Sequence, residues 1–223
     1  MSDLAGRLAG VRSEIDDAAR AAGREPGALT LIVVTKFHPA SLVAELAALG
    51  IRDVGENRHQ EAREKAAELA GLGLTWHFVG QLQSKKARQV REYASVIHSL
   101  DRESVVDALR SDEASVDGFI QVNLTDDPGR GGVRPDDLEP FAERVLGTPG
   151  IRLRGLMAVA PLDEAPRPAF ARVRDLGERM RRLAPEATDL SMGMSHDFRE
   201  AIAEGATHLR IGTAITGNRP TRG

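Results

Sequence analysis

A lysine ends the first apolar run of the sequence, at a position where an amine could do chemistry. Lys36 directly follows the run Leu31-Ile32-Val33-Val34-Thr35, which is typical of a buried strand. A desolvated lysine amine is a potential Schiff-base nucleophile. The alternative is a salt-bridged or snorkelling lysine, and the spacing of Lys36 alone favours that alternative.

Two later segments are suited to binding a phosphate group. Ser195 precedes the predicted helix 196–204, where an N-cap serine and free backbone N–H groups can hold an anion. Arg210-Ile211-Gly212-Thr213 ends the last predicted strand. There, Gly212 allows close backbone approach and Thr213 offers a hydroxyl. Capping alone would explain an isolated serine, so the case for phosphate depends on both segments lying together.

Alternating strand and helix patterns predict how these residues are positioned. After an N-terminal helix, the predicted strands are 30–35, 51–54, 75–79, 95–98, 118–123, 151–158, 188–191 and 208–211. The predicted helices between them are 39–49, 57–70, 83–92, 102–111, 135–147, 167–184 and 195–204. Eight such units favour an α/β fold with a (β/α)8 TIM-type barrel. A doubly wound open sheet is the alternative, although no glycine-rich dinucleotide or Walker loop follows the first strand.

In a barrel, the residues that follow each strand converge on one mouth. The pooled set is Lys36, Gly55-Glu56-Asn57, Gly80-Gln81-Leu82, Ser99, Asn123, Met157, Gly193-Met194-Ser195, Arg210 and Gly212-Thr213. Phosphate sites in such barrels commonly use the loops after strands seven and eight, which makes phosphate binding the better interpretation of Ser195 and Gly212-Thr213. Two long loops, 123–135 and 160–168, are expected at the same face.

An amine beside a phosphate site calls for a ligand with both an aldehyde and a phosphate, and pyridoxal 5′-phosphate has both. A guanidinium such as that of Arg210 stays charged at every relevant pH. Beside a pyridine nitrogen it would disfavour protonation of that nitrogen and so weaken the electron sink that many amino-acid reactions need.

Composition narrows the class of protein. The 223 residues contain no cysteine, which excludes disulfides, thiolate metal sites and a cysteine nucleophile and fits a reducing cytoplasm. A net charge of −3 argues against nucleic-acid binding, and no apolar stretch is long enough to span a membrane. The sequence shows no linker or repeat, so residues 1–223 are expected to form a single domain.

Several motifs, taken in order, resemble the pyridoxal-phosphate homeostasis protein family, which is related to the barrel domain of alanine racemase. They are Val34-Thr35-Lys36, GEN at 55–57 with Gln60-Glu61, WHFVGQLQSKK at 76–86, RGLMA at 154–158, SMGMSHDF at 191–198 and RIGTAITG at 210–217. The chain departs from the commonest form of the family at Phe37-His38, Arg130 and Thr216.

The resemblance implies a role for each matching residue. Lys36 would hold pyridoxal phosphate as a Schiff base, and Arg210 would lie near the pyridine nitrogen. Ser195, Gly212 and Thr213 would bind the phosphate, while Asn57 and Met157 would line the ring pocket. His77 is interpreted as a structural histidine inside a strand. No metal and no catalytic residue are expected.

The related racemase also needs a tyrosine from a separate β-domain, which this chain is not expected to have. Tyr93, the single tyrosine, is predicted to lie away from the mouth. The leading hypothesis is therefore a monomeric cytoplasmic protein that stores the cofactor or passes it to apo-enzymes. The alternatives are a racemase or lyase of low activity, and an aldolase-type barrel that forms a Schiff base without a cofactor.

Overall fold

Eight parallel strands close into a barrel in the computed structural model, which describes residues 4–125 and 127–218. Each strand pairs with its neighbours in sequence, and β1 pairs with β8 to close the ring. The strands are β1 (Thr30–Val34), β2 (Asp53–Glu56), β3 (Thr75–Phe78), β4 (Val96–Leu100), β5 (Val116–Gln121), β6 (Ile151–Met157), β7 (Asp189–Ser191) and β8 (His208–Ile211). The barrel is the predicted fold, and the open sheet is excluded.

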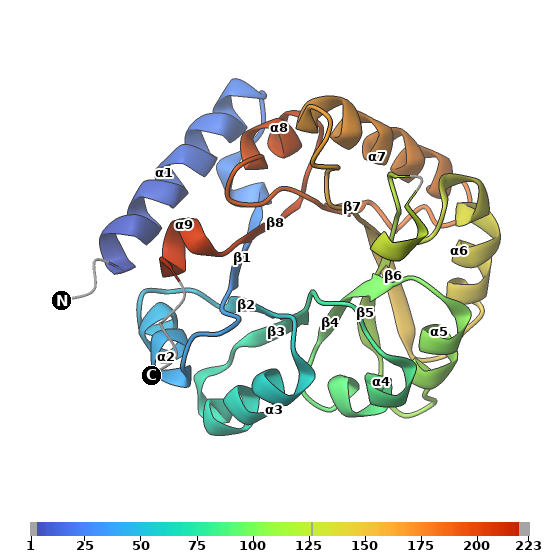
Figure 1. Cartoon of the computed structure of the whole chain (residues 1–223), viewed down its shortest axis with the longest axis horizontal. Helices are drawn as coiled ribbons and strands as arrows, with labels where there is room; N and C mark the ends of the chain where they lie inside the picture. The colour runs from blue at the N-terminus through green and yellow to red at the C-terminus, as the bar shows by residue number, and fades with distance from the viewer. Residues whose placement is uncertain (1–3, 126, 219–223) are drawn as a thin grey trace.

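Helices surround the barrel, as Figure 1 shows in a view down its axis. They are α1 (Leu4–Ala21), α2 (Ala40–Ala48), α3 (His59–Glu68), α4 (Ser84–Arg91), α5 (Glu103–Leu109), α6 (Leu138–Leu146), α7 (Pro166–Met180), α8 (Phe198–Ala203) and α9 (Thr213–Thr216). Short 3-10 turns lie at Pro26–Ala28, Ala70–Leu72, Pro128–Arg130 and Pro135–Asp137. The predicted N-terminal helix is α1, which packs against α8 and α9.

The start of β2 differs from the prediction, which placed a strand at 51–54. Gly50 adopts a left-handed conformation with φ of 85°, and the N–H of Ile51 donates to the carbonyl of Leu46. The N–H of Gly50 donates to the carbonyl of Ala47. This pair of bonds is a Schellman motif, so Ile51 closes helix α2 and its apolar side chain contributes to the core rather than to a strand.

Aromatic rings fill part of the barrel interior, where branched aliphatic side chains are usual. His98 on β4 stacks on Phe119 of β5 with ring centroids 4.6 Å apart. Phe119 also meets His208 of β8 edge-on at 5.1 Å. Since β4 and β8 lie on opposite sides of the ring, these contacts cross the interior. Histidine side chains therefore fill part of the barrel interior below the mouth.

These buried imidazoles make the stability of the fold dependent on pH. Burial lowers the pKa of His208 to about 4, from the usual value of about 6.5. Below pH 6.5 the unfolded chain then binds a proton that the folded chain does not, so stability is lost as the pH falls toward 4. Between pH 7 and pH 5 we expect His208 alone to cost about 2 kcal/mol.

The measurement is urea unfolding at pH 7 and pH 5 on the wild type and on His208→Gln. The variant should lose about 2 kcal/mol less on acidification. The contribution of Glu56, whose pKa burial raises, cancels in this comparison. An equal loss in both proteins would contradict the prediction.

Within the described ranges 4–125 and 127–218, none of the helices has the length and apolar character needed to cross a membrane.

Candidate functional site

A cavity of about 320 Å³ lies at the carboxyl ends of the strands. All the residues predicted to bind the cofactor line it, namely Lys36, Asn57, Met157, Ser195, Arg210, Gly212 and Thr213. The remaining lining residues are Val34, Val79, Gly80, Val159, Met194 and His196. The closed barrel thus brings together residues that are up to 179 positions apart in the sequence, from Val34 to Thr213.

The backbone on both sides of Lys36 is held by hydrogen bonds. On one side, the N–H of Thr35 donates to the carbonyl of Gly55 at 2.9 Å. On the other, the N–H of Phe37 donates to Glu61 Oε1 at 2.6 Å, and Phe37 has a φ of 69°. A non-glycine residue in this left-handed region is uncommon and needs such support. The Lys36 amine is exposed in the cavity and makes no hydrogen bond or ion pair within the described chain.

A buried lysine lies behind this segment. Lys65 Nζ donates to Glu56 Oε1 and Glu61 Oε1, each at 2.7 Å, and to the carbonyl of Thr35 at 2.9 Å. Lys65 and Glu56 are only 5% and 1% exposed. Burial raises the pKa of Glu56, while hydrogen bonds from Lys65 and Thr35 oppose that rise. Sequence reasoning missed Lys65, because a lysine in a charged helix normally indicates a solvated face.

Arg210 forms the floor of the cavity. Its Nη1 donates to the carbonyl of Ser191 at 2.6 Å and to Ser191 Oγ at 2.7 Å, and its Nη2 donates to the carbonyl of Ala158 at 2.9 Å. Burial lowers the pKa of Arg210 to about 10, and the charge of Asp197 opposes that shift. The guanidinium is therefore still cationic at neutral pH, and it is fixed in place.

The segments at Ser195 and Gly212-Thr213 meet at one side of the cavity, where the N–H of Ala214 approaches Ser195 Oγ at 3.5 Å. The backbone N–H groups of Ser195, Gly212 and Thr213 find no acceptor within residues 4–125 and 127–218. Such a group of backbone donors is suited to an anion.

The predicted capping role of Ser195 is wrong. Helix α8 begins at Phe198 with Asp197 at its N-cap, and Asp197 Oδ1 accepts from the N–H of Met194 at 2.5 Å. This bond closes a turn over 194–197, which delays the start of the helix. Ser195 therefore lies in the turn and faces the cavity.

Seven residues of the pooled set do not line the cavity, namely Gly55, Glu56, Gln81, Leu82, Ser99, Asn123 and Gly193. Ser99 is inside β4, where the pairing with β5 shifts register between Ile97 and Leu100. Glu56 is bound to Lys65. Asn123 lines a neighbouring cavity of about 290 Å³, which is built from the loops after β5 and β6.

Comparisons with known proteins first define the class. The family model described as alanine racemase, N-terminal domain, matches residues 8–220. Alanine racemase from Corynebacterium glutamicum has a similar fold, with a TM-score of 0.67 over 96% of this chain and 61% of that one, at 16% identity. The chain thus has the fold of the alanine racemase N-terminal domain class.

Closer relatives define the family. The pyridoxal phosphate homeostasis protein of Pseudomonas aeruginosa is 44% identical over 98% of this chain and 97% of its own length. That of Escherichia coli is 38% identical, over 98% of each chain. The structure of PipY from Synechococcus elongatus has been solved with PLP bound, and PipY is 38% identical to this chain. The two structures match with a TM-score of 0.83, over 96% of this chain and 100% of PipY. The chain belongs to the pyridoxal phosphate homeostasis protein family, as the sequence motifs predicted.

Proposed function

We propose that this protein binds pyridoxal 5′-phosphate in the cavity at the barrel mouth, holds it covalently on Lys36, and buffers or transfers it. The observation that carries the proposal is that one cavity contains both an amine and a group of backbone donors that have no partner among residues 4–125 and 127–218. When bound, the cofactor supplies an aldehyde that forms a Schiff base with a primary amine.

The residues of the cavity fit this cofactor. Asn57 Oδ1 is a buried acceptor with no partner in the described residues, so a polar ligand group would satisfy it. The Nε–H of the cationic Arg210 also has no acceptor among the residues that the structure describes. Met157 lies at the end of β6, where its flexible apolar side chain can contact a flat ring.

Each residue then has a distinct task. Lys36 provides the amine, and its position is fixed by the bonds to Thr35 and Phe37. The backbone at Ser195, Gly212 and Thr213 receives the phosphate dianion. Arg210 faces the pyridine nitrogen and, as a cation, disfavours protonation there.

Storage and transfer fit the site better than racemisation. The second base of the related racemase is a tyrosine, and Tyr93, the single tyrosine of this sequence, does not line the cavity. Its hydroxyl lies 3.4 Å from His59 Nδ1, and its ring stacks on His59 with centroids 5.8 Å apart. Burial raises the pKa of Tyr93, which keeps the phenol protonated. We further propose a monomer that passes the cofactor to apo-enzymes.

The test is to add pyridoxal 5′-phosphate to the wild type and to Lys36→Ala, and to record the visible absorbance. The wild type should develop a band, and borohydride reduction should leave a mass adduct on the Lys36 peptide. Lys36→Ala should lose both the band and the adduct.

Lys85→Ala is the matched control, because Lys85 is an exposed lysine on α4 outside the cavity. It should behave as the wild type does. A band that survives in Lys36→Ala, or an adduct on another lysine in the wild type, would refute the covalent role. Amino-acid turnover that depends on Lys36 would favour an enzyme instead.

A further inference from the structure

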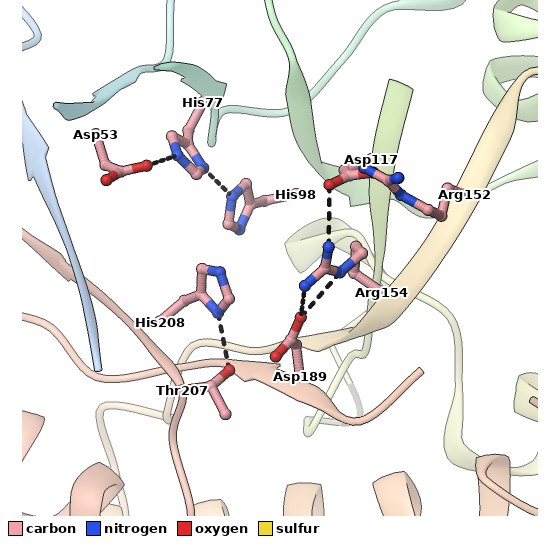
Figure 2. Close-up of polar contacts among 9 residues, drawn as sticks. All are labelled: Asp53, His77, His98, Asp117, Arg152, Arg154, Asp189, Thr207 and His208. Atoms are coloured by element: carbon pink, nitrogen blue, oxygen red, sulfur yellow. Dashed lines mark hydrogen bonds and ion pairs between the residues drawn. The ribbon is translucent and has the colours of Figure 1, made fainter. Parts of the chain in front are cut away.

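A chain of hydrogen bonds runs from Arg210 through the barrel interior to its opposite opening. Arg210 Nη1 contacts Ser191 Oγ at 2.7 Å, and Ser191 Oγ contacts His98 Nδ1 at 2.9 Å. His98 Nε2 contacts His77 Nδ1 at 2.9 Å, and His77 Nε2 contacts Asp53 Oδ1 at 2.9 Å. Figure 2 shows the Asp53, His77 and His98 part of this hydrogen-bond chain, with His77 between the other two.

The chemistry of the groups gives the chain a direction. A guanidinium can only donate, so Ser191 Oγ accepts from Arg210 and can turn its own proton toward His98 Nδ1. His98 is completely buried, and burial together with the charges of His77, Arg210 and His208 lowers its pKa well below the usual range. A neutral His98 that accepts at Nδ1 must carry its proton on Nε2, from which it donates to His77 Nδ1. His77 then donates from Nε2 to the carboxylate of Asp53.

The chain is more than the packing of a single histidine. It joins β2, β3, β4, β7 and β8, and its three inner groups, His77, His98 and Ser191, each meet a polar partner on both sides. Buried polar groups in such a network polarise one another, because the surrounding dielectric is low. The hydrogen-bond chain ends at the solvent-exposed surface, because the side chain of Asp53 is 31% exposed.

Other charged groups also face this end of the barrel. Arg154 on β6 binds Asp117 of β5 and Asp189 of β7, and Arg152 binds Asp117. His208 bonds to Thr207 Oγ1 at 2.8 Å and faces His98 edge-on. In Figure 2, the two arginines and the two aspartates form an ion-pair cluster, His208 and Thr207 form a separate pair, and neither has a dashed bond to the histidines of the hydrogen-bond chain. Asp117 therefore offers a matched carboxylate that lies outside the chain.

We propose that Asp53, His77, His98 and Ser191 are positioning residues that orient the Arg210 guanidinium and transmit the charge of Asp53 to the ligand above it. The proposal rests on the proposed function, because it takes the ring nitrogen of pyridoxal phosphate as the partner of Arg210. When the hydrogen-bond chain is intact, Ser191 Oγ donates its proton to His98 and keeps a lone pair directed at Arg210. Without it, the hydroxyl can rotate, and Arg210 keeps only its two carbonyl partners.

The first experiment uses the protein without cofactor. Long-range ¹H–¹⁵N spectra of the histidine rings should show both His77 and His98 protonated on Nε2 and unprotonated on Nδ1. Ser191→Ala should shift the His98 Nδ1 resonance, because that nitrogen loses its donor. A His98 ring that carries its proton on Nδ1 would overturn the direction of the chain.

The second experiment titrates the visible band of the protein loaded with pyridoxal 5′-phosphate. The first variant is Ser191→Ala, which interrupts the hydrogen-bond chain between Arg210 and His98. The second is Asp53→Asn, which keeps an acceptor for His77 but removes the negative charge. Each should lower the midpoint of the titration by at least about 0.5 pH unit, because Arg210 is then less compensated and disfavours ligand protonation more strongly.

Asp117→Asn is the control, because it removes a carboxylate charge from the same end of the barrel without changing a residue of the hydrogen-bond chain. It should leave the midpoint unchanged. An equal shift in Asp117→Asn, or no shift in Ser191→Ala, would overturn the proposal. A wild type that gives no band at all would refute the proposed function, while the cofactor-free spectra would still decide the geometry of the chain.

Discussion

Replacing Lys65 by methionine should lower the free energy of unfolding by about 3–5 kcal/mol, because it leaves a buried carboxylate without its counter-charge. Glu56 is 1% exposed and has Lys65 as its cationic partner. Its second oxygen, Oε2, already has no partner in the described chain. The folded protein would have to protonate Glu56 or open the segment to water. The carbonyl of Thr35 would lose a donor at the same time.

The measurement is urea unfolding followed by circular dichroism. Lys85→Met on the exposed face of α4 is the control and should change stability by less than about 0.5 kcal/mol. Adding Glu56→Gln to Lys65→Met removes the stranded charge and should recover part of the loss. If Lys65→Met costs less than about 1 kcal/mol, the ion pair does not hold this segment together.

The second large effect is expected at Gly80, which follows β3 in the wall of the cavity. A Cβ atom there would lie 2.4 Å from the carbonyl oxygen of Asn57 and 2.7 Å from its Cα. Both are backbone atoms, so the strain cannot be relieved by rotating a side chain. Gly80→Ala must therefore displace Asn57, and we expect a loss of about 1–3 kcal/mol in stability together with at least about tenfold weaker binding of pyridoxal phosphate.

Fluorescence or absorbance titration with pyridoxal phosphate measures this change in affinity. Gly71→Ala is a suitable control, because a Cβ at Gly71 meets nothing within 4 Å. It should bind as tightly as the wild type. Unchanged affinity in Gly80→Ala would show that Asn57 can move without consequence for the ligand.

The barrel and its mouth could be predicted because they depend on local patterns. Apolar runs mark the strands, and a residue that follows a strand must lie at one end of the barrel whatever the details of packing. This placed Lys36, Arg210 and Gly212 together correctly. The ends of elements were less predictable, because single capping bonds decide them. Ile51 and Asp197 are the two examples described above.

The buried polar networks could not be predicted from the sequence. Whether His77 meets His98 depends on the relative register of β3 and β4. The further contact from His98 to Ser191 depends on closure of the barrel, since their strands are not neighbours. His77 was therefore interpreted as a lone structural residue. Lys65 was missed for a similar reason, because its contact with Glu56 depends on how α3 packs against β2.

The difference in exposure between the rim and the floor of the cavity has a kinetic consequence. Val159 and Met194 at the rim are 40% and 37% exposed, whereas Arg210 on the floor is 5% exposed. A molecule that reaches Lys36 through this rim passes exposed side chains rather than packed core. Its rates of arrival and departure should then be set by diffusion and by bond formation and hydrolysis at the amine. Exchange of the cofactor would then be much faster than global unfolding, which is what the proposed role in buffering or transfer requires.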